Sequence, residues 1–374
     1  MLARLGIARL QVQTPLQTCG GKCQSSAGAS RLLSLCPWAP PLAALASSAR
    51  RFGHRHSAIS RSAGKKAQRV QSLQVQERWR CFEGTLFHCS YRSQALGGLR
   101  SSFSVYIPDA PRMQMVLPYP DDCEEFPVVM YLSDMGCSHM EVVKESTALE
   151  HSAACGLIFL AADTSPRGEG VPDEPRVDLG IGASFYVNAT EKPWAEHYRM
   201  QDYLEELLDL VHKNFPTCGP EEVSLMGHAM GGLGALATAI RRPKSFRSVS
   251  VLTPIAHPTA IPELSEKSVP DVRAALSAYL GSEKAWRKYD PTCLIEDCST
   301  KHASQLPPIL LDVGSETLQS RGEVYRPLEF VNTCSMQGVP VELRVRAGFD
   351  HSHFFVTSVM EEHLDFHSKH LDAV

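Results

Sequence analysis

The chain has 374 residues and a formal net charge of −4, with 43% hydrophobic and 21% charged residues. This composition is that of a globular protein, and once a leader is set aside about 300 residues remain for one large domain. The body has no broad basic patch and no run of roughly 18 apolar residues, so we expect neither nucleic acid nor a membrane as partner.

Residues 1–75 form a segment of different composition from the rest. No Asp or Glu precedes Glu77, Arg and Ser are abundant, and Met1–Leu10 can form a basic amphipathic helix. This composition is typical of a transit peptide, and a disordered extension without a targeting role is the alternative. We expect a mitochondrial protein, with another organelle as an alternative and the cytosol if the leader is not functional. Residues 76–374 are then predicted to form a single α/β domain.

The body alternates strand-like and helix-like segments. One helix is predicted after residue 199, because Met200, Leu204 and Leu207 share a face opposite Glu205 and Glu206. Strands separated by helices indicate a mainly parallel sheet covered on both faces, with ligands bound beyond the carboxyl ends of the strands. The predicted strands include 102–107, which alternates like a strand with one exposed face, and the apolar runs 127–132, 156–161 and 222–226. Further strands are predicted at 248–252, 308–313 and 341–345.

A sharp strand-to-helix turn is predicted at residues 227–231. The sequence Gly-His-Ala-Met-Gly fits the G-x-S-x-G nucleophile elbow of α/β-hydrolases, except that Ala229 stands where the nucleophilic serine belongs. A glycine-rich junction of another α/β fold is the alternative for this motif alone. The pattern therefore predicts the frame of a hydrolase without its nucleophile.

The twelve cysteines form no C-x-x-C pair and no paired metal spacing. We expect mostly reduced thiols and no metal, with Cys293 and Cys298 isolated on a loop.

Three longer motifs resemble the S-formylglutathione hydrolase (esterase D) family. They are Asp163–Gly168 (D-T-S-P-R-G), Gly182–Trp194 (G-A-S-F-Y-V-N-A-T-E-K-P-W) and Gly348–Phe355 (G-F-D-H-S-H-F-F). The resemblance runs from about residue 83 to about residue 371 in the order of the family. It implies the α/β-hydrolase fold and the cleavage of S-formylglutathione, a thioester of formaldehyde detoxification, by a Ser-His-Asp triad.

The partners and cofactors also follow from the resemblance. It implies a small thioester or ester such as a glutathione conjugate as ligand, and neither a metal nor an organic cofactor. A homodimer is left open.

The resemblance implies three catalytic positions, and this chain keeps the expected residue at only one of them. His351 stands at the position of the general base, within an intact D-H-S context. Ala229 occupies the nucleophile position, and Thr317 occupies the position of the acid. Glu316 lies one residue earlier and could replace the acid only if its loop were shifted.

The loop that supplies the oxyanion pocket is altered as well. The backbone N–H groups of Met135 and Met230 are expected to form this pocket, which holds negative charge in the transition state. Asp134 stands where the family has glycine, so a carboxylate is expected near the place where that charge develops.

Four further residues near the predicted site could serve catalysis or ligand binding, or could have only a structural role. Cys137 is a candidate replacement nucleophile, although nothing in the sequence indicates a lowered pKa. His228 is expected to be structural, and Arg167 and Arg199 are expected to pair with acidic loop residues rather than with a ligand.

Three functions remain open from the sequence. The chain could be an impaired homologue that still binds a ligand or a partner, an esterase with an unconventional nucleophile, or an interaction subunit with an empty pocket. Loss of the serine alone removes about 10⁶ in kcat in a serine protease, and this favours the impaired homologue.

Overall fold

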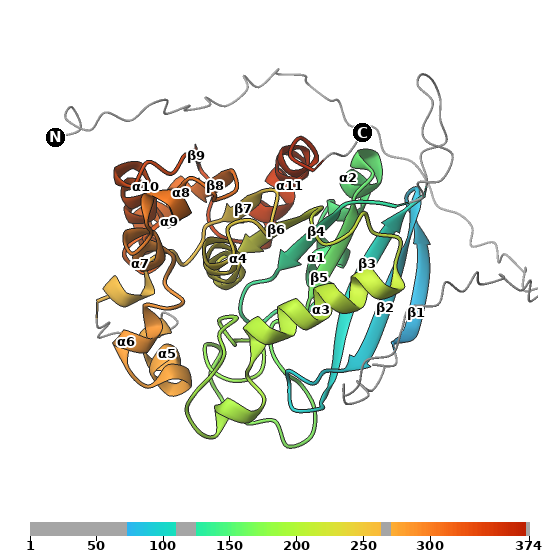
Figure 1. Cartoon of the computed structure of the whole chain (residues 1–374), viewed down its shortest axis with the longest axis horizontal. Helices are drawn as coiled ribbons and strands as arrows, with labels where there is room; N and C mark the ends of the chain where they lie inside the picture. The colour runs from blue at the N-terminus through green and yellow to red at the C-terminus, as the bar shows by residue number, and fades with distance from the viewer. Residues whose placement is uncertain (1–72, 110–124, 263–270, 372–374) are drawn as a thin grey trace, which may run out of the picture. The chain divides into compact units, whose positions relative to one another are not determined.

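The computed structural model describes residues 73–109, 125–262 and 271–371, and the predicted leader lies outside these ranges apart from its last residues. A nine-stranded sheet of order β1-β2-β3-β5-β4-β6-β7-β8-β9 organises the described residues (Figure 1). The first three pairings along this order, as far as β3 with β5, are antiparallel, and the remaining five are parallel. The predicted mainly parallel sheet is confirmed. The strands are β1 (Gln74–Cys81), β2 (Gly84–Arg92), β3 (Arg100–Pro108), β4 (Val128–Leu132), β5 (Ile158–Ala162), β6 (Val223–His228), β7 (Val249–Leu252), β8 (Ile309–Gly314) and β9 (Val341–Arg346).

Helices cover both faces of the sheet (Figure 1). One apolar core lies between the sheet and α1, α2 and α11, and the other lies between the sheet and α3, α4 and the helices from α5 to α10. Alternate residues of β4 supply both cores: Val128 and Met130 point to one face and Val129 to the other. The helices are α1 (Glu141–Glu145), α2 (Ala148–Cys155), η1 (Trp194–Glu196), α3 (Met200–Asn214), α4 (Met230–Arg241), η2 (Pro258–Ala260), α5 (Val272–Leu280), α6 (Glu283–Trp286), α7 (Pro291–Glu296), α8 (Thr300–Ala303), α9 (Ser315–Tyr325), α10 (Pro327–Met336) and α11 (His353–Ser368).

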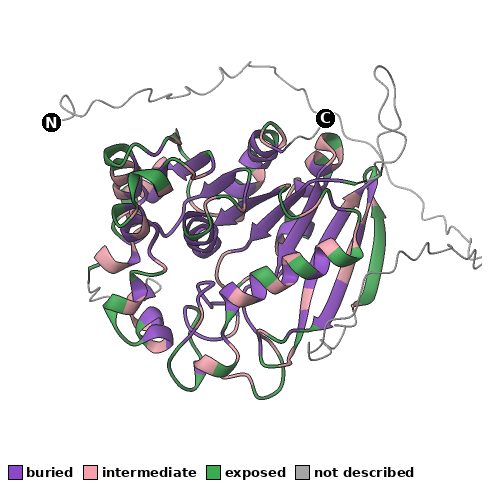
Figure 2. Ribbon diagram, in the orientation of Figure 1, coloured by how far each residue is buried: buried purple, intermediate pink, exposed green. Residues whose placement is uncertain are grey.

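The central strands are buried along their length, as Figure 2 shows. The prediction that 102–107 has one exposed face is wrong, because both Val105 and Tyr106 of β3 are fully buried. The side chain of Val105 packs in one core and that of Tyr106 in the other. An apolar core covers each face of the sheet at this strand, so only Ser102 and Ile107 of 102–107 are partly exposed.

The edge strand β1 was not predicted from the sequence. It begins at Gln74, two residues before the predicted domain boundary, and is exposed along almost its whole length (Figure 2). Its backbone pairs with β2, so hydrogen bonds rather than apolar burial hold it in place. No helix among the described residues has the length and hydrophobicity needed to cross a membrane.

Candidate active site

The predicted elbow is present between β6 and α4. Ala229 has φ 46° and ψ −104°, a conformation that is strained for a residue with a side chain, and it is fully buried. Its N–H donates to Leu252 O at 2.9 Å and its carbonyl accepts from Ile255 N at 3.1 Å. The backbone is thus held in the strained form that a nucleophile elbow needs, although the methyl group of alanine offers no attacking atom.

Glycines let this turn approach its neighbours closely. A Cβ atom on Gly231 would lie 1.9 Å from Leu132 O, at the end of β4. A Cβ atom on Gly227 would lie 2.2 Å from Gly231 O. Both positions therefore exclude a side chain, and the close contact places the start of α4 against the loop that follows β4.

That loop carries Asp134, whose side chain turns toward the two backbone N–H groups that the sequence assigns to an oxyanion pocket. Asp134 Oδ1 accepts hydrogen bonds from the backbone N–H of Met135 at 2.7 Å and of Met230 at 3.1 Å. These are the two groups that the sequence assigned to the oxyanion pocket. Burial raises the pKa of the Asp134 carboxyl, and the two backbone hydrogen bonds oppose that rise.

The position of this carboxylate conflicts with acyl-transfer chemistry. Such chemistry needs free donors aimed at the oxygen on which negative charge develops. Here both donors are engaged by Asp134, which itself carries negative charge when ionised. Two like charges 4 Å apart repel by about 4 kcal/mol at an effective dielectric constant of 20, equivalent to about 10³ in rate.

His351 lies in the loop between β9 and α11. This loop is fastened to the beginning of α9, where Phe349 O accepts from Glu316 N at 3.0 Å and Ser315 Oγ accepts from Gly348 N at 2.9 Å. The carbonyl of His351 accepts from His228 Nε2 at 2.9 Å, which ties the loop to the elbow. The predicted base is therefore brought to the same edge of the sheet as Ala229.

The ring of His351 is contacted by an arginine that sequence reasoning missed. Arg321 Nη1 lies 3.2 Å from His351 Nε2, and a guanidinium can only donate. Nε2 must therefore accept, which leaves the proton of the neutral ring on Nδ1. Burial and then the charge of Arg321 lower the pKa of His351. A general base needs that lone pair for a substrate proton, and here a cation occupies it.

No carboxylate orients the His351 ring within the described part of the chain. Thr317 is buried and its hydroxyl has no hydrogen-bond partner there. Glu316 is exposed, and among the described residues its carboxylate makes no hydrogen bond or ion pair. The nearby Asp350 carboxylate accepts instead from the backbone N–H and hydroxyl of Ser352.

Cys137 and His228 border the oxyanion pocket without chemical activation. Cys137 Sγ lies 3.4 Å from His353 Nε2, but burial raises the pKa of this thiol to about 12. A nucleophilic cysteine requires the opposite shift. Burial lowers the pKa of His228 to about 3, so its ring is neutral and serves the hydrogen bond to the His351 carbonyl.

The two loop arginines make ion pairs. Arg167 Nε lies 3.0 Å from both carboxylate oxygens of Asp163, and its Nη2 donates to Cys137 O at 2.9 Å. Arg199 pairs with Asp202, Nε to Oδ2 at 3.0 Å. The pairings match the structural roles expected for both, and Arg167 also supports the loop that carries Asp134.

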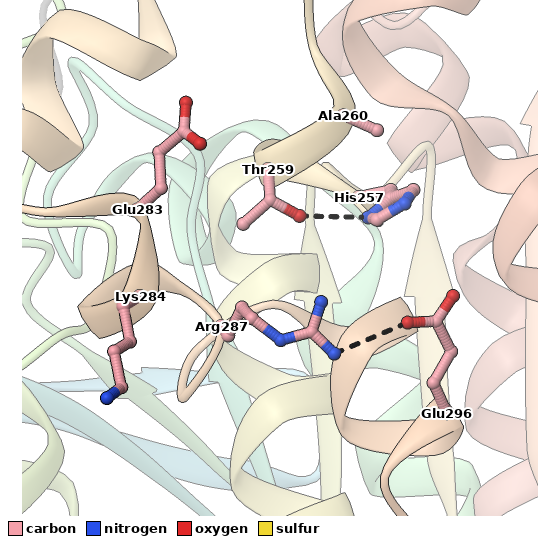
Figure 3. Close-up of a pocket in the computed structure, with 7 residues that line it drawn as sticks. All are labelled: His257, Thr259, Ala260, Glu283, Lys284, Arg287 and Glu296. Atoms are coloured by element: carbon pink, nitrogen blue, oxygen red, sulfur yellow. Dashed lines mark hydrogen bonds and ion pairs between the residues drawn. The ribbon is translucent and has the colours of Figure 1, made fainter.

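A separate open pocket of about 530 Å³ lies among η2, α6 and α7 (Figure 3). None of the elbow residues lines it. Its wall includes His257, Thr259 and several charged side chains, among them Arg287, which pairs with Glu296 at 3.5 Å.

Comparison with known proteins gives three kinds of similarity. The model of the Esterase family matches residues 104–365. S-formylglutathione hydrolases of Rattus norvegicus and Mus musculus are 34% and 36% identical over 288 residues, which is 75% of this chain and 97% of each relative. A solved S-formylglutathione hydrolase from Agrobacterium tumefaciens is 33% identical with a TM-score of 0.69, covering 79% of this chain and 99% of that chain. Fluorophosphonate-binding serine hydrolase F from Staphylococcus aureus, at 16% identity and a TM-score of 0.58, shares the fold alone.

Proposed function

Because the chain belongs to the Esterase family of α/β-hydrolases and is similar to S-formylglutathione hydrolases, we propose that it is a member that has lost hydrolysis and serves as a binding or interaction protein. One observation carries this proposal. The Asp134 carboxylate takes both N–H groups of the oxyanion pocket, so the pocket is filled by the protein itself.

Three further features of the site support the same conclusion. Ala229 has no attacking oxygen, Thr317 cannot ionise, and Arg321 donates to the ring nitrogen of His351. These three changes affect the nucleophile, the acid and the base, and Asp134 affects a fourth role, that of the oxyanion donors. Replacing one residue would therefore leave the other three defects in place.

An esterase with Cys137 as nucleophile is the competing function. It would need a thiolate near neutral pH, whereas burial raises the pKa of Cys137 to about 12. The nearby Asp134 carboxylate adds to that rise. The described geometry therefore favours a protein that does not hydrolyse esters.

Hydrolysis assays on the wild type and on Ala229→Ser test the proposal. S-formylglutathione and a small aryl acetate serve as substrates, and His351→Ala provides the background rate. We expect both proteins to match that background, because the serine of Ala229→Ser would have neither a free base nor free oxyanion donors. Wild-type turnover that a thiol or serine reagent abolishes would overturn the proposal.

Thermal unfolding with a non-hydrolysable glutathione thioether separates the two remaining roles. A ligand that binds only the folded state raises the melting temperature with concentration, by RT ln(1 + [L]/Kd) in free energy. A concentration-dependent rise supports a binding protein. An unchanged melting temperature argues for an interaction subunit whose family pocket takes no ligand.

A further inference from the structure

Three potential metal ligands meet beside the open pocket, and none of them belongs to the elbow. They are His257, which precedes η2, Asp290, which caps α7, and Cys293 in the first turn of α7. Asp290 and Cys293 are buried, and the His257 side chain is 15% exposed. The prediction that Cys293 lies on a loop is wrong, because α7 begins at Pro291 with its N-terminus capped by Asp290.

The donor atoms of these three side chains lie close together. His257 Nδ1 is 2.9 Å from Asp290 Oδ2 and 3.2 Å from Oδ1. One donor atom from each of the three residues lies within 4.8 Å of the others. Bond lengths of about 2.0–2.3 Å and tetrahedral angles separate the N, O and S ligands of zinc by about 3.4–3.6 Å. Zinc would thus need only small side-chain movements.

The chemistry of the three ligands suits zinc. Imidazole, carboxylate and thiolate together form a mixed nitrogen, oxygen and sulfur set of borderline softness. One carboxylate and one thiolate also balance the two positive charges of the ion. A buried cluster without net charge avoids the large cost of an isolated buried charge.

Surrounding hydrogen bonds hold the ligands in position. Asp290 Oδ2 accepts from Thr259 N at 2.9 Å and from Thr259 Oγ1 at 2.6 Å, and Asp290 Oδ1 accepts from Cys293 N at 3.1 Å. Thr259 Oγ1 also lies 3.3 Å from Cys293 Sγ. Outer-shell contacts of this kind orient metal ligands, and their loss commonly lowers metal affinity by about 10–100-fold.

We propose that His257, Asp290 and Cys293 bind one zinc ion with an open fourth coordination position facing the pocket in Figure 3. His257 and Thr259 both line that pocket, so the exposed side of the cluster is the side toward it. Three protein ligands and one open position characterise zinc sites that bind an exchangeable water or a small ligand. A carboxylate or hydroxamate compound is the class expected to reach the metal there.

The same residues could instead form only a hydrogen-bonded link between η2 and α7. In that case Asp290 and His257 carry the link, and the thiol of Cys293 is dispensable. In the zinc site the thiolate is a direct ligand. Replacement of Cys293 therefore distinguishes the two arrangements.

Cobalt(II) titration of the purified full-length protein, after removal of metal by a chelator, tests the site. We expect one equivalent to bind tightly, with a near-ultraviolet sulfur-to-cobalt band and visible bands of tetrahedral intensity, and zinc to displace it. Cys293→Ser should lose the sulfur band and at least tenfold in affinity. Cys298→Ser, which removes a half-buried thiol just beyond α7, should keep both.

A second variant protects the test against misfolding. His257→Asn should lose at least tenfold in affinity while keeping the circular dichroism of the wild type. Adding acetohydroxamate to the cobalt protein should shift the visible bands if the fourth position is open. The proposal is overturned if no stoichiometric metal binds, if Cys293→Ser retains the sulfur band, or if acetohydroxamate leaves the visible bands unchanged.

Discussion

Replacing Asp134 with glycine would empty the oxyanion pocket. The change is best made in an Ala229→Ser background, so that a hydroxyl is present to use the freed donors. Removing the carboxylate releases the N–H groups of Met135 and Met230, which now bind Oδ1 at 2.7 and 3.1 Å. It also removes the negative charge from the place where an oxyanion would form.

The expected gain follows from the number of donors released. Losing a single oxyanion donor costs about 10²–10³ in kcat in a serine protease. We therefore expect Asp134→Gly/Ala229→Ser to exceed Ala229→Ser by at least about 10²-fold in kcat/KM. Because Thr317 supplies no carboxylate and Arg321 still occupies His351 Nε2, the double variant should still lie roughly 10⁴–10⁶-fold below a complete triad.

Initial rates with an aryl acetate, together with intact-mass detection of an acetylated enzyme, measure this gain. The matched control is Glu169→Gly in the same background, which removes an exposed carboxylate from the loop after β5 and should leave the rate unchanged. Equal rates for Ala229→Ser with and without Asp134→Gly, both proteins being folded, would refute the view that Asp134 blocks the pocket.

Three further changes test other parts of the site. Cys137 should react with iodoacetamide at pH 7.5 at least tenfold more slowly than an exposed thiol, because burial raises its pKa to about 12; peptide mass spectrometry measures this. Gly231→Ala should lower the free energy of unfolding by about 3 kcal/mol or more in urea denaturation, because its Cβ would lie 1.9 Å from a backbone oxygen. Arg321→Gln should raise the pKa of His351, which burial and then the Arg321 charge lower; NMR titration of the ring protons measures this.

Each of these changes has a matched control. The exposed Cys218 provides the reference rate of alkylation, and equal reactivity of Cys137 would contradict its burial. Gly322→Ala, where a Cβ meets nothing within 4 Å, should leave stability unchanged or raise it by up to about 1 kcal/mol. Arg326→Gln, which removes the partner of Glu329, should not move the pKa of His351. An unchanged pKa in Arg321→Gln would show that the guanidinium does not act on the ring.

The parts of the fold that sequence predicted best are those with simple periodicity. β4, β5 and β6 are buried on both faces and read as uninterrupted apolar runs, and α3 shows a clear apolar stripe. β1 was not predicted because its residues are exposed and mostly polar, so they show no apolar pattern. Its pairing with β2 depends on backbone hydrogen bonds.

The same distinction applies to the candidate site: local motifs predict some of its residues, and only the folded chain brings the others together. Motifs located Ala229, Thr317 and His351. They could not show that the Asp134 side chain accepts from the N–H of Met135 and also from that of Met230, which is 96 residues further along the chain than Asp134. Arg321 was missed because α9 departs from helical geometry at that residue, with φ −138°, and no local pattern predicts its contact with His351. Cys293 was assigned to a loop, and only the capped start of α7 brings it near His257.

NMR spectroscopy can observe directly the two amides that Asp134 binds, those of Met135 and Met230. Selective ¹⁵N-methionine labelling gives one backbone amide signal for each methionine that follows Met1, including Met135 and Met230. If Asp134 occupies the pocket, Asp134→Gly should move these two amide proton signals upfield, because each loses a hydrogen bond to a carboxylate, while the signal of Met200 at the start of α3 stays in place. Signals of Met135 and Met230 that do not change between the wild type and Asp134→Gly would contradict the account.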